Sequence, residues 1–252
     1  MKLASWNVNS LKVRLPRLLE LLAEHRPDVV CLQETKCTVE AFPRAELAGA
    51  GYGFAEHSAG RWNGVAILAR EGVAIEDVVR GLPGEAAGDE ARYLEARVDG
   101  MRVASVYVPN GRAVDDPAFD EKLAFLDALA LRAPGLDVLA GDLNVTRAEQ
   151  DVYDPAAFAG STHVTPAERS RLGAIIEAGL GDAFRALEPH APGFTWWDYR
   201  QGHFHRKMGL RIDYALLGAA LAGSLVSCGI DRGFRKGPKP SDHAPLLAET
   251  AG

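Results

Sequence analysis

Short apolar stretches that end in polar residues recur along this chain and alternate with helical patterns. Residues 2–8 and 28–34 have the length and composition of buried strands. Between them, Leu11, Leu18 and Leu22 fall on one face of a predicted helix. Because each apolar face must pack against another element, this alternation favours helices covering sheets. We therefore expect an α/β sandwich.

The rest of the chain follows the same pattern without a break in composition. Thr165 and Glu168 have the spacing of a capping box at a helix start, and Gly179 can end that helix. A loop is expected at residues 84–89. Further strands are expected at residues 52–57, 65–69, 93–98, 101–108, 137–140, 194–197, 212–217 and 246–249, and a further helix at 117–131. Residues 1–252 are predicted to form one domain.

The composition excludes several classes of protein. The chain has 252 residues, of which 47% are hydrophobic and 25% charged, which suits a single folded core. It contains no apolar run long enough for a transmembrane helix, and residues 1–7 lead directly into a strand without a secretory signal pattern. Cys31, Cys37 and Cys228 form neither a disulfide framework nor a zinc spacing. We expect a cytoplasmic protein with no membrane partner.

Charge is distributed unevenly. The formal net charge is −6, which argues against a protein that coats DNA non-specifically. However, residues 199–212 and 232–241 each contain four basic side chains and no acidic one. These two segments lie close to chemical motifs in the sequence and could line a groove that binds nucleic acid, although basic segments are usually only a solvated surface.

Polar side chains follow many of the predicted strands. Asn7, Glu34, Asn110 and Asp142 each lie at or just beyond the end of such a strand, and Asp213 opens a later one. A rigid sheet brings strand ends together into one crevice, where α/β proteins place their sites. Carboxylate and amide oxygens suit a hard divalent cation, so the sequence predicts bound magnesium or manganese rather than zinc.

The order of the motifs resembles the exonuclease III family within the endonuclease/exonuclease/phosphatase superfamily. The resemblance extends from residue 2 to about residue 247. It implies a four-layered sandwich of two mixed β-sheets packed face to face with helices outside. Asn110 stands where other members have Gln, which leaves the preceding motif tyrosine in place. The motifs are Trp6-Asn7-Val8-Asn9, Leu32-Gln33-Glu34-Thr35-Lys36, Tyr107-x-Pro109-Asn110-Gly111, Gly141-Asp142-x-Asn144, Phe194-Thr195-Trp196-Trp197-Asp198-Tyr199-Arg200, Leu210-Arg211-Ile212-Asp213 and Ser241-Asp242-His243.

The resemblance implies roles for the residues at the first strand ends. Glu34 is expected to bind the metal, with Asn7 as a ligand or close neighbour. Tyr107 is expected to contact the scissile phosphate. Asp142 would activate the attacking water or help to hold a metal. Asn144 would orient that water, stabilise the pentacovalent phosphate and lie within reach of the metal.

The later motifs complete the implied site. Asp213 is expected to hold His243, which would act as a general base or as a phosphate-stabilising donor near the metal. An alternative is that Arg211 pairs with Asp213 and leaves His243 to solvent. Asp242 resembles a ligand at a second metal position.

Other matching positions are expected to bind substrate. Trp196 and Leu210 resemble an apolar pocket for a flipped-out abasic sugar, although strand aromatics are often core. Tyr107 and Asn110 would face the phosphate. Lys236 and Lys239 lie in the second basic segment and would contact the DNA backbone.

The resemblance therefore implies a monomeric DNA repair nuclease acting on duplex DNA with abasic or blocked 3′ ends. It would hydrolyse the phosphodiester at abasic (AP) sites and have 3′→5′ exonuclease and 3′-phosphatase or 3′-phosphodiesterase activity. Two alternatives stay open at this point. One is a superfamily hydrolase of lipid or inositol phosphates, and the other is a nucleic-acid binder without catalysis.

Overall fold

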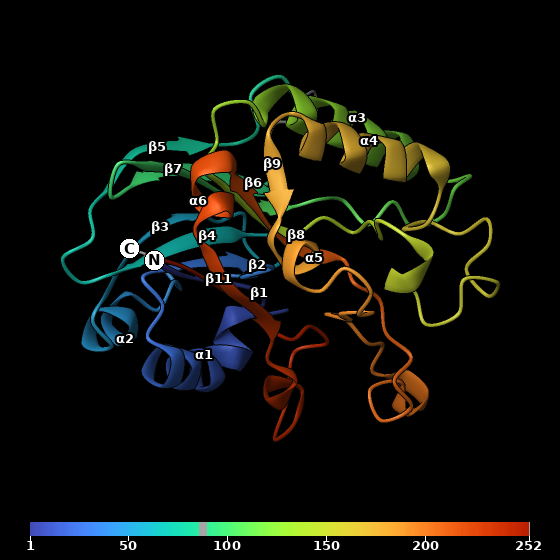
Figure 1. Ribbon diagram of the computed structural model, residues 1–252. Helices are drawn as coiled ribbons and strands as arrows, with labels where there is room; N and C mark the ends of the chain where they lie inside the picture. The colour runs from blue at the N-terminus through green and yellow to red at the C-terminus, as the bar shows by residue number, and fades with distance from the viewer. Residues whose placement is uncertain (86–89, 252) are drawn as a thin grey trace.

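Two six-stranded sheets pack face to face in the computed structural model, which describes residues 1–85 and 90–251 (Figure 1). Most of the predicted loop at 84–89 lies outside the described residues. The first sheet has the order β11 (Leu225–Ile230), β12 (Leu246–Thr250), β1 (Lys2–Asn7), β2 (Val29–Gln33), β4 (Val65–Arg70) and β3 (Tyr52–His57). The second has the order β5 (Ile75–Arg80), β6 (Tyr93–Val98), β7 (Met101–Tyr107), β8 (Val138–Asp142), β10 (Asp213–Gly218) and β9 (Leu180–Asp182).

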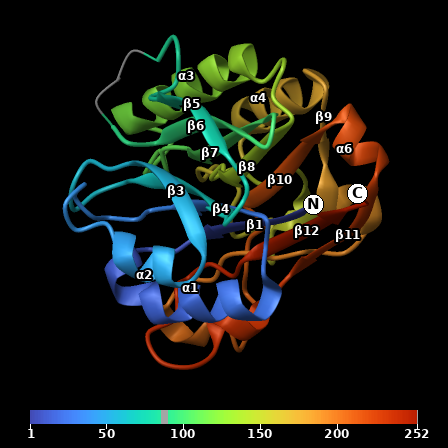
Figure 2. The same ribbon diagram turned by 90° about the vertical axis from the view of Figure 1, so that its left-hand side faces the viewer.

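Helices cover the outer faces of both sheets, which gives the predicted four layers (Figures 1 and 2). The helices α1 (Leu11–His25) and α2 (Arg44–Gly49) pack on the first sheet, and α3 (Pro117–Arg132) and α4 (Pro166–Glu177) pack on the second. Short elements fill the connections: α5 (Ala183–Leu187), α6 (Ala219–Gly223), and the 3₁₀ turns η1 (Glu149–Asp151), η2 (Arg200–Gly202) and η3 (Arg232–Arg235). The predicted fold class is confirmed.

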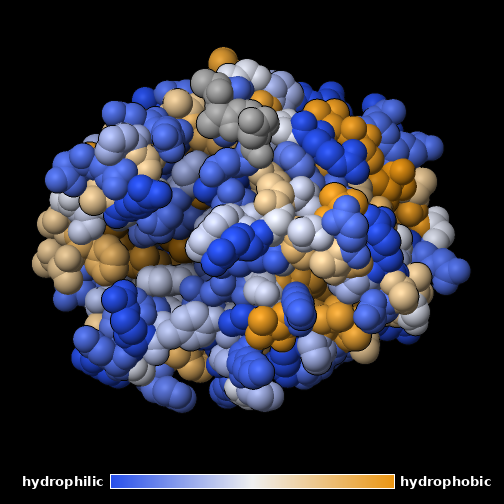
Figure 3. Space-filling view, turned by 180° about the vertical axis from the view of Figure 1, so that it is seen from behind, coloured by the Kyte–Doolittle hydropathy of each residue, from blue (hydrophilic) through white to orange (hydrophobic). Residues whose placement is uncertain are grey.

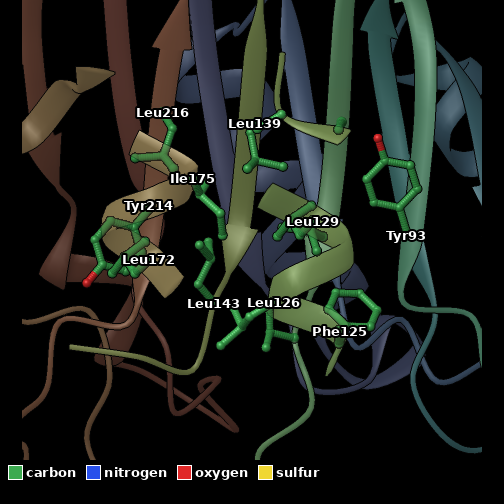
Figure 4. Packing of buried hydrophobic residues seen from close by; sticks show 14 of the residues in the cluster. Tyr93, Phe125, Leu126, Leu129, Leu139, Leu143, Leu172, Ile175, Tyr214 and Leu216 are labelled. Carbon is green, nitrogen blue, oxygen red and sulfur yellow. The ribbon is translucent and has the colours of Figure 1, made fainter. Parts of the chain in front are cut away.

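Large apolar side chains join the second sheet to its helices. Figure 4 shows Leu129 of α3 near Leu139 of β8, with Leu126 of α3, Ile175 of α4 and Leu216 of β10 in the same cluster. All five side chains are fully buried. Burying one such side chain contributes about 1.5–3 kcal/mol, so this layer is a rigid support for the strand ends.

Strand pairing then brings the polar strand ends together. β1 and β2 are parallel, with Asn7 opposite Gln33, and β7 and β8 are parallel, with Tyr107 opposite Asp142. On the other side of β8, Asp213 of the antiparallel β10 is also opposite Asp142. Asp142 is thus flanked within its own sheet by two further candidate site residues.

The structure corrects the predicted strands in two ways. The sequence did not predict β5, β9 and β11, and all three are edge strands. An edge strand packs less of its surface, so β5 and β11 lack the apolar run that marks the central strands. Conversely, residues 194–197 form no strand, since Trp196 makes only isolated bridges to Leu210 and His243.

Surface features agree with the composition. Figure 3 shows a face on which hydrophilic side chains predominate and separate the hydrophobic patches. Within residues 1–85 and 90–251, each helix is too short or too polar to cross a bilayer.

Candidate active site

The loops that follow the strand ends have an unusual backbone. Asn9, Glu34, Lys36 and Asn144 all have a positive φ, between 41° and 51°. Such a conformation is costly for a residue with a side chain and persists where the surroundings enforce it, often at functional sites. Gly141 has a different constraint, because a Cβ there would lie 2.0 Å from the Val106 carbonyl oxygen.

An amide joins two carboxylates at the centre of the site. The buried Asn7 Nδ2 donates to Glu34 Oε1 at 2.7 Å and to Asp142 Oδ2 at 2.9 Å. The Asn7 Oδ1 atom accepts from the Asn9 main-chain N–H, which fixes the orientation of the amide. The structure therefore brings Asn7, Glu34 and Asp142 together, with the nitrogen of Asn7 facing both acids.

A histidine links two acids on neighbouring strands. His243 Nδ1 lies 2.9 Å from Asp213 Oδ2, and His243 Nε2 lies 3.7 Å from Asp142 Oδ2. At most 3% of the surface of each of these three residues is exposed. Arg211 pairs instead with Asp151 and Asp182, so the alternative in which it occupies Asp213 is wrong.

Burial and crowding shift the pKa values of this group. Burial raises the pKa of Asp142 to about 8, against the effect of His243 and with the help of Asp213 and Glu34. Burial also disfavours the His243 imidazolium, but the Asp213 and Asp142 carboxylates outweigh it and raise the pKa of His243 to about 10. These carboxylates therefore need a positive partner to be ionised together.

Tyr107 and Asn144 flank these acids. Burial, assisted by Glu34 and Asp142, raises the pKa of Tyr107 well above its usual value, so this residue is a neutral hydroxyl donor. The Asn144 main-chain N–H donates to Asp142 Oδ1 at 3.0 Å, and its side chain donates to the Val108 carbonyl oxygen at 2.9 Å. Asp142 and Asn144 are thus fixed relative to each other.

Asp242 is connected to the acid cluster through Asn9, whose main-chain N–H donates to Asn7. Its Oδ1 accepts from Asn9 and its Oδ2 accepts from the Trp196 indole, each at 3.0 Å. Trp196 is partly exposed, but Leu210 is fully buried against Val152. Leu210 packs in the apolar cluster against which Trp196 lies, so Trp196 is the more accessible of the two predicted pocket residues, and the substrate contact of Leu210 stays a prediction.

Several basic side chains of the two basic segments are buried or paired within the protein, so they are not available to bind DNA. Arg211 and Arg235 are buried, and Arg200 pairs with Asp198. Lys236 and Lys239 are exposed on the loop that leads from η3 to β12. The loops around residues 196–209 and 231–241, orange and red in Figure 1, project from the lower side of the molecule. Charge available to a phosphate backbone therefore comes from a subset of the predicted residues.

Several residues of the site had no assigned role in the sequence. Lys36 Nζ lies 2.7 Å from both Glu34 Oε2 and Asn9 Oδ1. The Arg92 guanidinium lies 4.8 Å from the centre of the Tyr107 ring. Lys36 is part of the Gln33-Glu34-Thr35-Lys36 motif. Arg92 belongs to no motif, and only the pairing of its segment with Tyr107 brings it to the site.

The donor set fits a hard divalent cation. Glu34, Asp142 and His243 each offer a ligand atom, and these atoms lie within 4.8 Å of one another. In the described part of the chain, the buried Asp213 Oδ1 has no hydrogen-bond partner. Glu34 and Asp142 would hold such an ion, because carboxylate oxygens are its preferred ligands.

Comparison with known proteins agrees with this geometry. The model of the Endonuclease/Exonuclease/phosphatase family matches residues 4–243. The chain belongs to this family. It is 31% identical over 267 aligned positions to exodeoxyribonuclease III of Haemophilus influenzae, with 99% of each protein covered.

Solved structures give the same result. A Neisseria 3′ phosphatase, NExo, bound to a product DNA hairpin has a TM-score of 0.95 and 38% identity, and an AP endonuclease from Archaeoglobus fulgidus has 0.95 and 34%. Both alignments cover 100% of each chain. The predicted exonuclease III-type nuclease is confirmed, and the lipid-phosphate alternative is disfavoured.

Proposed function

We propose that this protein hydrolyses phosphodiester bonds of duplex DNA at abasic sites and at blocked 3′ ends, with Mg²⁺ or Mn²⁺. The observation that carries this proposal is the contact of His243 with Asp213 and its approach to Asp142, beside Glu34. Phosphodiester hydrolysis needs a positioned water, a route for its proton and neutralised phosphate oxygens. We further propose that the protein acts as a single-domain monomer in the cytoplasm.

The protein's own side chains divide these tasks. Asp142 is placed to orient the attacking water and accept its proton, and Asn144 is placed to hold the same water. Asp213 fixes His243 Nδ1–H, so that His243 Nε2 faces Asp142 and the phosphate. Tyr107, held neutral, donates to a phosphate oxygen. A divalent cation held by Glu34 and Asp142 would supply further charge neutralisation at the phosphate.

Trp196 supports the choice of an abasic sugar. Its indole N–H donates to Asp242, and Trp196 packs against the apolar cluster that contains Leu210. A rigid, partly exposed aromatic surface next to the acids can accept a sugar without a base, which costs little to extrude from the duplex.

Exposed side chains around the site support binding to duplex DNA. Trp62 is 63% exposed, and the Arg61 guanidinium lies 5.1 Å from the centre of its ring. The next residues, Asn63 and Gly64, accept main-chain hydrogen bonds from Lys36 and Thr35. An aromatic and a cation are thereby tied to the Glu34 loop, where they can meet the DNA backbone and groove.

A second candidate function is processing of 3′ ends with little incision at internal abasic sites. It is favoured by the 38% identity to two structures described as a Neisseria 3′ phosphatase and a Neisseria 3′-5′ exonuclease. The acid cluster serves both candidates, because both break a phosphate ester bond.

Three duplexes distinguish the candidates: one with an internal synthetic abasic site, one with a 3′-phosphate at a nick, and one intact. We expect Mg²⁺-dependent cleavage of the first two and slower 3′→5′ degradation of the third. Activity on the 3′-phosphate alone would support the second candidate. Binding without cleavage of any duplex would show a non-catalytic protein.

The Trp196→Ala variant tests the abasic pocket. It should reduce the preference for abasic over intact DNA more than it slows 3′-phosphate removal. Leu131→Ala is the control, since it removes an exposed apolar side chain near the C-terminal end of α3, to which no DNA contact is assigned. Unchanged discrimination in Trp196→Ala would reject the pocket.

A further inference from the structure

A lysine is buried beneath the loops that carry the site. Lys122 lies on α3, and its side chain is 0% exposed. Its ammonium group pairs with Glu168 of α4, whose side chain is also 0% exposed. A buried lysine is costly unless paired and hydrogen-bonded, so its presence beside a reaction site needs an explanation.

The ammonium group connects three loops. Lys122 Nζ donates to the carbonyl oxygens of Asn144 at 2.7 Å and Asn110 at 3.2 Å, and to Thr162 Oγ1 at 3.1 Å. A lysine has three hydrogens to donate, and four acceptors lie within reach once Glu168 is included, so at least one hydrogen is shared between two of them. The loops after β7 and β8 and the loop before α4 therefore share one anchor.

The chain leaves room for this anchor at Gly111. Its φ is 81°, and a Cβ at this position would lie 2.9 Å from Lys122 Cδ. Gly111 thus lets the loop bend directly over the lysine stem. This packing explains the glycine of the Pro-Asn-Gly motif.

His163 extends the network toward the substrate side. Its Nδ1 lies 2.7 Å from the Asn144 carbonyl oxygen, so Nδ1 carries the proton and donates. Its Nε2 is then an acceptor and lies 3.4 Å from the exposed Asn110 Nδ2. Burial, with the charge of Lys122, lowers the pKa of His163 to about 3, which agrees with a neutral ring.

We propose that Lys122, neutralised by Glu168, is a positioning residue for the reaction. It holds the main chains of Asn144 and Asn110. The Asn144 carbonyl oxygen held in this way fixes the tautomer of His163, which in turn orients the Asn110 side chain toward substrate. This inference rests on the proposed function, because it assigns Asn144 and Asn110 to the phosphate.

The test uses Lys122→Met and the neutral pair Lys122→Met/Glu168→Gln. The single variant leaves a buried carboxylate unpaired, whereas the double variant removes both charges and keeps one carbonyl oxygen to accept from the Thr165 cap. Glu95→Gln is the matched control, since Glu95 is a buried acid of β6 paired with Arg102 and Arg132. Each folded variant is assayed in single turnover with saturating Mg²⁺ and DNA, and DNA affinity is measured separately.

We expect both Lys122 variants to cleave about 10- to 100-fold more slowly, as is typical when an orienting partner is removed, with DNA affinity changed by less than about threefold. Glu95→Gln should lose stability and keep the rate. Long-range ¹H–¹⁵N spectra of the His163 ring should show the Nδ1–H tautomer in the wild type and its loss in both Lys122 variants. A folded double variant with the wild-type rate would overturn the proposal.

Failure of the proposed function would look different. If the wild type leaves the abasic duplex intact but removes 3′-phosphate, the same comparison is made on the 3′-phosphate duplex. The His163 spectrum reports on the network without any cleavage, so it still decides whether Lys122 fixes the ring.

Discussion

Two buried clusters of charged side chains begin only two residues apart, at Arg211 and Asp213, and they differ in how their charge is balanced. The Arg211 guanidinium makes four hydrogen bonds to Asp151 and Asp182. Asp151 also pairs with Arg185. We call this the closed cluster, because arginines of the chain itself neutralise both acids.

The second group, which we call the open cluster, contains Glu34, Asp142 and Asp213. Its ion pairs within the described residues are with Lys36 and His243. Three carboxylates therefore share two cations, one of which is a histidine. The comparison indicates that a closed cluster stabilises the fold, whereas an open cluster reserves a place for a ligand cation.

The largest expected effect concerns the unit formed by Asp213 and His243. Asp213→Asn and His243→Asn should each lower the single-turnover cleavage rate by about 10³- to 10⁴-fold, because the ring loses the carboxylate that orients it and favours its charged form, or is itself removed. The double variant should be hardly slower than either single variant. The measurement is a double-mutant cycle on the DNA that the wild type cleaves. Fully multiplicative losses would show that the two residues act independently.

Removing a charge from the open cluster should separate activity from stability. Glu34→Gln should cut the rate by more than about 100-fold and abolish Mn²⁺ binding measured by calorimetry, because a metal ligand is removed. Its free energy of unfolding in metal-free buffer should be unchanged or higher, since carboxylate repulsion is relieved. Glu20→Gln, on the exposed side of α1, is the control. Full activity of Glu34→Gln in chelator would reject the metal site.

The closed cluster should respond in the opposite way. Arg211→Met leaves Asp151 and Asp182 buried with less compensation, so it should lower the free energy of unfolding by about 3–5 kcal/mol. Urea denaturation measures this loss, and the folded variant should keep most of its cleavage rate. Arg97→Met is the control, because its pair with Asp77 is exposed and is worth at most about 1 kcal/mol. Equal losses in both variants would remove the distinction between the clusters.

The smallest expected effect lies outside both clusters. Lys236→Ala and Lys239→Ala should weaken DNA binding similarly for all sequences. Each should reduce the slope of log affinity against log salt by about one, because one DNA phosphate is no longer neutralised by the protein. Titrations at several salt concentrations measure the slope. Lys2→Ala is the control, since Lys2 starts β1 at the end opposite Asn7. An unchanged slope would assign these lysines to solvation alone.

The sequence predicted the central strands and the residues of the open cluster more completely than the rest. Central strands are buried on both faces and therefore have continuous apolar runs, as residues 138–142 do. Their ends were marked by short polar motifs such as Gly141-Asp142. The edge strands β5 and β11 lacked such runs, because solvent covers part of them. β9 has only three residues, which is too short to show a pattern.

Partners distant in sequence were harder to predict. Lys122 carries no signal of its own within the predicted helix at 117–131, although helical spacing places it on the same side as Phe119 and Leu126. Its partner Glu168 was predicted only as part of a capping box. Similarly, Arg211 and Asp213 lie two residues apart in the sequence, and only the fold shows that Arg211 pairs with Asp151 and Asp182 while Asp213 pairs with His243. Which side chains pair depends on how the strands are aligned with one another, and a short sequence motif does not reveal that alignment.

The position of β12 has a consequence for synthesis on the ribosome. Residues 246–249 pair with residues 2–5 in the middle of the first sheet, and the two ends of the described chain lie side by side in Figures 1 and 2. Contacts so distant in sequence form late in folding. His243 lies just before β12. The acid–histidine unit is therefore completed late in synthesis, and we expect a product that ends before β12 to lack the strand pairing that positions His243.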